Sequence, residues 1–217
     1  MPDDSKSYSE FALIDLLDAF ASNAPVPGGG SAAALAGALG VSMLVMAASL
    51  PKSRTGAPEE ATDLAEAAAR LRPLRDALVE LIDADSAAYR AVMAALKLPN
   101  AADEEKAART AALQSALKGA TDVPLDVMRA GQQALAGAVV VARNAYRVAA
   151  SDVATGVELL ASTVRSAALS IDGNLAAIKD GSYAARVSAE REQLAGDSAR
   201  DAAQALEMLS GTPKSRP

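Results

Sequence analysis

The sequence predicts an all-α protein, a single antiparallel bundle of about six or seven helices. Alanine, the best helix former, is the commonest residue, and hydrophobic residues make up 51% of the chain. Aromatic residues make up only 3%, and the β-branched and aromatic runs that are typical of strands are nearly absent. Because no hairpin signal interrupts the helical spacing, we expect one helical domain over residues 7–210, between disordered ends at residues 1–6 and 211–217.

The first two expected helices lie on either side of a loop rich in proline and glycine. A helix over residues 7–22 has one apolar face, formed by Phe11, Ile14, Leu17 and Phe20. Residues 32–50 then form a run of 19 residues without a charge, about the length of a membrane span. Their alanine, glycine and serine content instead favours a buried helix packed on all sides. It carries a stripe of large residues (Leu35, Leu39, Met43, Met46, Leu50) and small residues for close contact (Ala33, Ala36, Gly37, Gly40).

Further helices are predicted by apolar residues at intervals of three and four. A long helix is expected over residues 58–98 and another over residues 101–118. Pro124 is expected in the opening turn of the next helix, which continues toward residue 147. Ser151 is expected to begin a helix that ends near residue 171, stopped by Gly173, and a last helix covers residues 179–209.

The composition excludes several kinds of chemistry. The chain has no cysteine and no histidine, which excludes disulfides, thiol chemistry and a catalytic zinc site of the usual kind. Acid–base chemistry must then come from Asp, Glu, Lys, Tyr or Arg. The net charge of −6 without a basic stripe disfavours nucleic-acid binding. The N-terminus lacks the pattern of a signal peptide, and we expect a cytoplasmic protein.

The loop over residues 24–31 has the sequence APVPGGGS. Its prolines forbid a regular element, its glycines bare the backbone, and Ser31 is a good N-cap for the helix that follows. The N–H groups at such a helix start attract an anion, but a packing turn between two helices explains the loop equally well. The match to G-x-G-x-x-A is not a dinucleotide site, because no strand precedes it and no acidic residue follows before Glu59.

Asp85 is the ionisable residue of greatest interest, because it lies on the apolar face of the long helix. A carboxylate there is costly unless it is paired, hydrogen-bonded or used in function. Tyr89, one turn later, is a possible partner, whereas Asp83 is expected to be solvated. Lys52 and Arg54 form a polar loop that either holds substrate carboxylates or is simply solvated.

Residues 25–40 resemble the signature of the cyclodeaminase/cyclohydrolase family, which includes methenyltetrahydrofolate cyclohydrolases and the cyclodeaminase domain of formiminotransferase-cyclodeaminase. Residues 85–93 are similar to the family's D-x-x-A-[FY]-x-x-V-M segment, and Leu98-Pro99 to the L-P that follows it. Residues 103–109 and 120–125 also follow the family's order, and Ser151, Asp152 and Asn174 resemble its later polar positions.

The resemblance implies an all-helical homodimer that binds a tetrahydrofolate derivative as substrate, without a metal or other cofactor. It implies either hydrolysis of 5,10-methenyltetrahydrofolate to 10-formyltetrahydrofolate or, as the alternative, release of ammonia from 5-formiminotetrahydrofolate. By analogy, Asp85 stabilises the cation or relays the proton, Asp152 orients the pterin or water, and Lys52 and Arg54 meet the glutamate tail. The other residues expected to contact the substrate are Pro27, Gly28, Gly29, Gly30, Ser31, Tyr89 and Asn174.

The sequence departs from the family at some polar positions. The family's G-N-x-N-x-x-S-D segment aligns with residues 145–152, where both asparagines are missing unless Asn144 serves with a shift. Ser170 stands where an asparagine is common, and the basic loop lacks an aromatic residue after its cations. A non-catalytic folate-binding or scaffolding dimer is therefore a further alternative.

Overall fold

A computed structural model describes residues 7–210 of the chain. Over this range the chain forms six α-helices and two short 3₁₀ turns, and the range contains no strand. The elements are η1 (Tyr8–Glu10), α1 (Leu13–Ala21), α2 (Gly29–Ala48), α3 (Pro58–Leu96), α4 (Asp103–Asn144), η2 (Arg147–Ala149), α5 (Ala150–Leu175) and α6 (Gly181–Ser210). The predicted all-α bundle is confirmed, while the ends predicted to be disordered, residues 1–6 and 211–217, lie outside the described residues.

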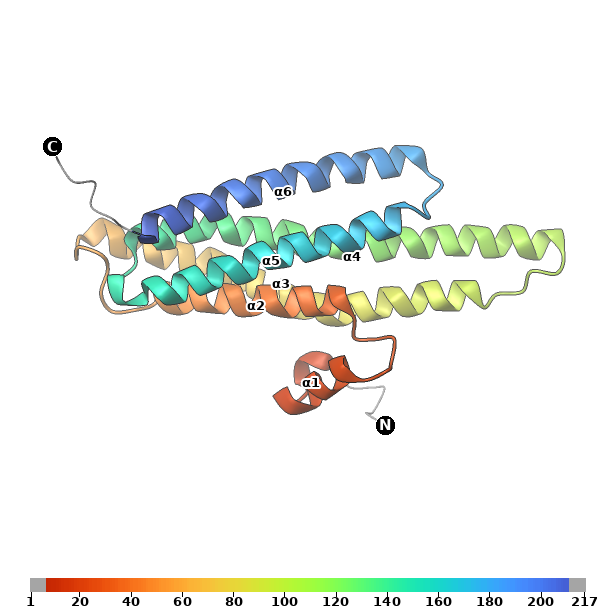
Figure 1. The fold of residues 1–217 in the computed structure, drawn as a ribbon, viewed down its shortest axis with the longest axis horizontal. Helices are drawn as coiled ribbons and strands as arrows, with labels where there is room; N and C mark the ends of the chain where they lie inside the picture. The colour runs from red at the N-terminus through yellow and green to blue at the C-terminus, as the bar shows by residue number, and fades with distance from the viewer. Residues whose placement is uncertain (1–6, 211–217) are drawn as a thin grey trace.

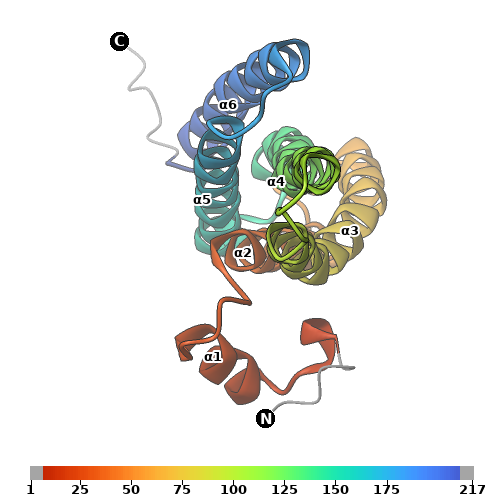
Figure 2. The ribbon, with the colours of Figure 1, turned by 90° about the vertical axis from the view of Figure 1, so that its right-hand side faces the viewer.

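Helices α2 to α6 form the bundle, and successive helices run antiparallel (Figure 1). α4 lies at the centre, because it packs against α2, α3, α5 and α6. The connection between α3 and α4 extends beyond the other helices at one end of the molecule. α1 stands apart from the bundle, on the side of α2 (Figure 2). The predicted helix over residues 7–22 is therefore wrong in extent, because an extended Ala12 separates η1 from α1.

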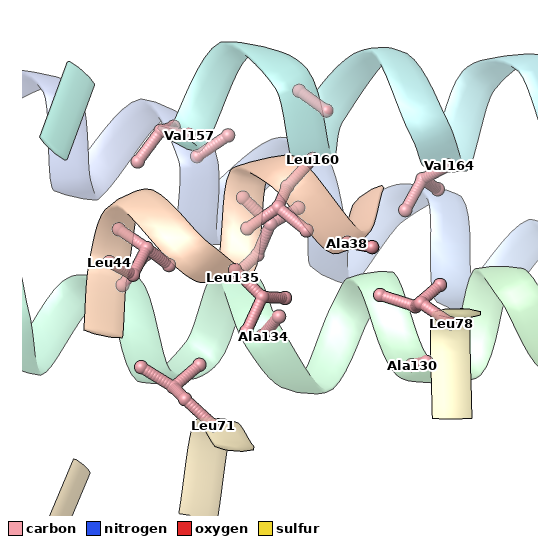
Figure 3. Packing of buried hydrophobic residues seen from close by; sticks show 14 of the residues in the cluster. Ala38, Leu44, Leu71, Leu78, Ala130, Ala134, Leu135, Val157, Leu160 and Val164 are labelled. Atoms are coloured by element: carbon pink, nitrogen blue, oxygen red, sulfur yellow. The ribbon is translucent and has the colours of Figure 1, made fainter. Parts of the chain in front are cut away.

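The core is built from small residues set against leucine and valine. In Figure 3, Leu78 of α3 lies beside Ala130 of α4, and neither side chain is more than slightly exposed. Gly40 of α2 and Gly156 of α5 meet back to back: a methyl group added to either would lie 2.9 Å from the carbonyl oxygen of the other. Because such a contact leaves no room for a side chain, backbone contact fixes the spacing of α2 and α5.

α2 does not pack on all sides, which corrects the expectation from its sequence. Its small face, with Ala33, Gly37 and Gly40, contacts α3 and α5. Its large residues Leu39 and Met46 remain 53% and 39% exposed. Among the described residues α2 is the one helix long and apolar enough to cross a membrane, but 61% of the apolar window is buried inside the bundle. The bundle thus accounts for one side of α2 and leaves the other uncovered.

α4 is one continuous helix, although the sequence predicted two helices separated before Pro124. Proline has no N–H to donate to the carbonyl oxygen of Ala120, four residues earlier. The side chain of Asn174 donates to that oxygen instead, at 2.7 Å. A long-range hydrogen bond thus compensates for the one that Pro124 removes. The predicted stop at Gly173 is also wrong, because α5 continues to Leu175.

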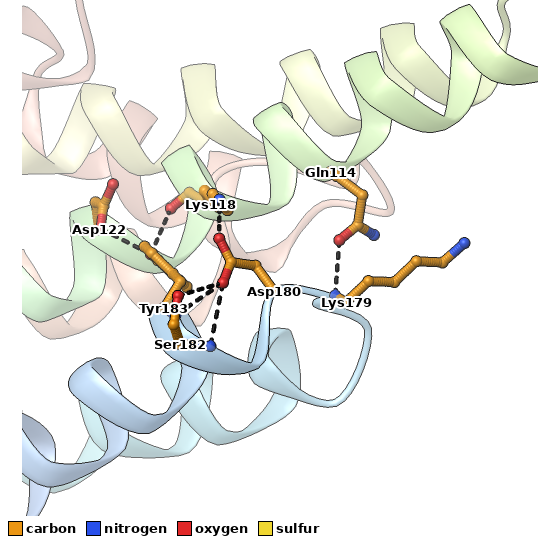
Figure 4. A network of polar contacts seen from close by, with 7 residues as sticks. All are labelled: Gln114, Lys118, Asp122, Lys179, Asp180, Ser182 and Tyr183. Carbon is orange, nitrogen blue, oxygen red and sulfur yellow. Dashed lines mark hydrogen bonds and ion pairs between the residues drawn. The ribbon is translucent and has the colours of Figure 1, made fainter.

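A polar network fastens the start of α6 to α4 (Figure 4). Asp180 accepts hydrogen bonds from the first backbone N–H groups of α6 and forms an ion pair with Lys118 at 2.7 Å. The hydroxyl group of Tyr183 lies 2.7 Å from Oδ1 of Asp122 and 3.1 Å from the carbonyl oxygen of Lys118. Burial and the Asp122 carboxylate raise the pKa of Tyr183, so the phenol stays protonated and can donate.

Replacing Tyr183 by phenylalanine should lower the free energy of unfolding by about 1 kcal/mol, because Asp122 loses a hydrogen-bond donor while the packing of the ring is kept. Urea denaturation followed by circular dichroism measures the change. Tyr89→Phe is the matched control, since the Tyr89 side chain is 39% exposed and its hydroxyl group has no hydrogen-bond partner among residues 7–210. Equal stabilities of the two variants would contradict this role for the Tyr183 hydroxyl.

Candidate functional site

The proline and glycine loop leads directly into α2. Pro27 is buried and follows a cis peptide bond, and Gly28 is the N-cap of the helix. Ser31 is therefore not the N-cap that the sequence suggested, because it already lies in the first turn. Its side chain is fully buried and points across to α3 instead of folding back on its own helix.

Ser31 holds the carboxylate of Asp85, which comes from the middle of α3. The backbone N–H of Ser31 donates to Oδ2 of Asp85 at 2.8 Å, and its hydroxyl oxygen lies 3.0 Å from the same atom. That hydroxyl also lies 2.8 Å from the carbonyl oxygen of Ile82 and 3.2 Å from the Ser86 hydroxyl. A negative charge is stabilised at a helix N-terminus. The anion at the start of α2 is thus the protein's own carboxylate.

Gly30 allows Asp85 to approach this closely. A methyl group at residue 30 would lie 2.0 Å from Oδ1 and 2.5 Å from Cγ of Asp85, far inside van der Waals contact. Both contacts with Ser31 go to Oδ2, and Oδ1 accepts no hydrogen bond from the described residues. Asp85 is half-buried, as expected for its place on the apolar face. The sequence suggested Tyr89 as a possible partner of Asp85, whereas in the structure the carboxylate is held by Ser31.

The other predicted residues at this end have different surroundings. Tyr89 lies one turn after Asp85 and is 39% exposed, without a hydrogen bond to that carboxylate. Asn174 uses its amide nitrogen on the Ala120 carbonyl, so this side chain has a structural role. Asp83 is not simply solvated, because it accepts hydrogen bonds from the Ser7 hydroxyl and from the backbone N–H of Tyr8 at 2.8 Å. Asp83 thereby anchors the N-terminal segment to α3.

The basic loop lies at the opposite end of α2 from the glycine loop. The 20 residues of α2 separate the two loops by about 30 Å. Lys52 and Arg54 line an open cavity of about 470 Å³ together with Tyr146. The Lys52 ammonium lies 5.7 Å from the centre of the Tyr146 ring, and Lys52 is otherwise exposed. Tyr146 supplies the aromatic surface that the basic loop itself lacks. The sequence did not predict this contribution, because Tyr146 lies 92 residues after Arg54 in the chain.

Arg54 has a structural task as well as a place in the cavity wall. Its Nη2 donates to the carbonyl oxygen of Ala142 at 2.9 Å, and its backbone N–H donates to that of Asn144 at 2.8 Å. Both carbonyls belong to the last turn of α4, where no helical partner is available. The Asn144 side chain is itself engaged by Asp63 at 3.0 Å. Arg54 therefore ties the basic loop to the end of α4.

Glu60 shapes the same loop from the first turn of α3. Its carboxylate accepts hydrogen bonds from the backbone N–H and hydroxyl of Thr55, at 2.8 and 2.9 Å, and from the N–H of Gly56 at 3.3 Å. The Thr55 N–H and the Ser53 side chain lead the contacts that lower the pKa of Glu60 to about 2. Asp152 follows Tyr146 closely in the sequence. It lies in the first turn of α5 and is half-buried. The predicted site residues thus form two groups, one at each end of α2.

The fold and the Asp85 carboxylate define the class of protein: a helical bundle in which a glycine loop holds an acidic residue at the start of a helix. A family model described as formiminotransferase-cyclodeaminase matches residues 12–193. The chain belongs to this family.

Two relatives and one solved structure illustrate the membership. A methenyltetrahydrofolate cyclohydrolase of Methylorubrum extorquens is 39% identical over 168 residues, covering 77% of this chain and 81% of the relative. A formimidoyltransferase-cyclodeaminase of Gallus gallus is 28% identical over 84% of this chain, which spans 34% of that longer protein. The crystal structure of a formiminotetrahydrofolate cyclodeaminase from Thermotoga maritima superposes with a TM-score of 0.83 at 24% identity, covering 93% of this chain and 97% of that one, a likeness in fold.

Proposed function

We propose that the chain hydrolyses 5,10-methenyltetrahydrofolate to 10-formyltetrahydrofolate. The observation that carries the proposal is the Asp85 carboxylate, which is held by Ser31 and Gly30 at the start of α2 with Oδ1 left to act. A methenyltetrahydrofolate cyclohydrolase that is 39% identical over 77% of the chain supports the choice of reaction. The substrate carries a delocalised positive charge on its bridging carbon, and a fixed carboxylate complements such a cation.

The reaction needs one water and no redox step. Water adds to the bridging carbon and releases one proton. N5 then takes up a proton as its bond to that carbon breaks, and the added hydroxyl group loses its proton as the carbonyl forms, so that the formyl group remains on N10 and one proton is released in total. We assign to Asp85 the stabilisation of the cation and the acceptance of the proton, a task within the range of a carboxylate. The bare backbone of Gly28 and Gly29 gives a flat pterin room to approach this group. Asp152, which lies in the group at the other end of α2, is proposed to orient the pterin or the water from a second copy of the chain.

We further propose that the active form is a homodimer. Lys52 and Arg54 suit the carboxylates of a glutamate tail, and Tyr146 offers an aromatic surface beside them. A folate with one glutamate is shorter than α2, so one chain does not bring both ends of this helix to a single molecule. A two-fold axis perpendicular to α2 would set the glycine loop of one copy beside the basic loop of the other.

The test is the loss of the near-ultraviolet absorbance of the methenyl chromophore on addition of micromolar protein. Enzyme-dependent loss well above the buffer rate, with 10-formyltetrahydrofolate as product, is the expected result. No enzyme-dependent loss would overturn the proposal. Release of ammonia from 5-formiminotetrahydrofolate tests the alternative activity, which the cyclodeaminase relatives favour.

The Lys52→Ala substitution should raise the KM for a polyglutamylated substrate. Its effect on kcat should be smaller.

A further inference from the structure

The outer face of α2 is an apolar surface without a partner in the single chain. In most bundle helices the large side chains point inward and the small or polar ones outward. α2 buries Val41 and Leu44 together with its glycines against the bundle, but it also leaves Leu39 and Met46 facing outward. The helix carries no charged residue at all. An uncharged outer face of this kind marks an interaction site.

The N-terminal arm, which we define as residues 7–28, carries a second apolar surface. Leu13, Ile14 and Leu17 of α1 are 72%, 64% and 50% exposed. Leu17 follows Ile14 by three residues and Leu13 by four, so the three side chains lie toward one side of the helix. α1 has little contact with the bundle and stands off on the side of α2 (Figure 2). The arm is nevertheless held at both ends, by Asp83 at η1 and by the buried Pro27 before α2.

Charge decides what covers these surfaces. Residues 7–51 contain three acidic residues, Glu10, Asp15 and Asp18, and no basic residue. Such a segment is repelled by an anionic membrane surface. The first basic residues after it are Lys52 and Arg54, at the far end of α2. A second copy with its α2 antiparallel would bring these cations toward Asp15 and Asp18, which gives a protein surface of complementary charge.

We propose that the arm docks on a second copy of this chain, with Leu13, Ile14 and Leu17 of each α1 packed on the Leu39 and Met46 face of the other copy's α2. The contact is isologous: the two exposed apolar surfaces of one chain cover the two of its partner. It removes from water all of the large apolar side chains that α1 and α2 leave exposed. This contact adds a definite interface to the homodimer proposed above, and it holds or fails independently of the reaction catalysed.

Cysteine crosslinking tests the contact directly, because the natural chain has no cysteine. Two differently tagged full-length chains, one carrying Ile14→Cys and the other Leu39→Cys, are co-expressed, purified together and mildly oxidised. The expected product is a covalent heterodimer joined between the two tagged chains. A single chain that carries both substitutions should also link mainly to another chain. Formation of an intrachain disulfide alone would overturn the proposal, because the arm would then rest on its own bundle.

Light scattering supplies the second readout. The double variant Ile14→Asp/Leu17→Asp should shift the protein from dimer to monomer while its circular dichroism stays unchanged, since both side chains are at least half exposed. Leu98→Asp is the control, an equivalent change at a 41% exposed leucine in the α3–α4 connection, and it should leave the dimer intact. A wild-type monomer, or a dimer that survives the double substitution, would overturn the proposal. Hydrolysis that fails in a dimer with the expected crosslink would count against the proposed function alone.

Discussion

Replacing Asp85 by asparagine is expected to lower kcat/KM for methenyltetrahydrofolate hydrolysis by about 10²-fold or more, the range for loss of a general acid–base group. Asparagine has nearly the same shape and can still accept a hydrogen bond from the Ser31 N–H, so the start of α2 should remain in place. It has no charge to complement the cation and does not take up the proton. The loss should therefore fall on turnover with little change in stability.

Stopped assays of the methenyl chromophore measure this effect, with urea denaturation to verify folding. Asp76→Asn is a suitable control, because Asp76 lies on the same helix, in an exposed ion pair with Arg75 at 2.7 Å. The control should keep wild-type activity. Full activity of the Asp85→Asn variant would show that the reaction does not pass through this carboxylate.

A comparable loss is expected from a single methyl group at residue 30. In the Gly30→Ala variant the new Cβ would occupy a place 2.0 Å from Oδ1 of Asp85, so the carboxylate must rotate away and give up its contacts with Ser31. We expect kcat to fall by about 10²-fold, because a misplaced catalytic group loses its contribution even when it is still present. The expected cause is displacement of Asp85.

Two further variants isolate this cause. Gly29→Ala adds the same methyl group one residue earlier, where nothing lies within 4 Å, and it should be nearly silent. The double variant Gly30→Ala/Asp85→Asn should be no slower than the slower of the two single variants, since two changes that disable one group are not additive. Additive losses would contradict the idea that Gly30 acts through Asp85.

The architecture of the bundle was predictable because alanine content and helical spacing are local properties. The join between the predicted helices at residues 118 and 124 was not predictable, because it depends on Asn174, about 50 residues away, donating to the carbonyl group that Pro124 leaves free. The orientation of α2 was also hidden. Both of its faces are uncharged, so the periodicity does not tell which one the bundle covers.

In the candidate site, too, features set by the local sequence were predictable and features set by contacts between helices were not. Asp85 stood out because a carboxylate on an apolar helix face needs a reason. Ser31 was singled out as an N-cap and a substrate contact, but its contact with Asp85 arises only when α2 and α3 pack together. Lys52 and Arg54 are near the glycine loop in sequence, yet a rigid helix turns that short separation in sequence into a long one in space.

The backbone contact between Gly40 and Gly156 lets α2 fix the separation of the two loops at its ends. Held against α5 without intervening side chains, the helix has little freedom to slide, so its residue count sets both the distance and the relative direction of its two ends. One inserted residue would lengthen it by about 1.5 Å and turn the far end by about 100°. Such a change would redirect the basic loop away from any partner that it meets. The length of α2 is therefore expected to change only by whole turns.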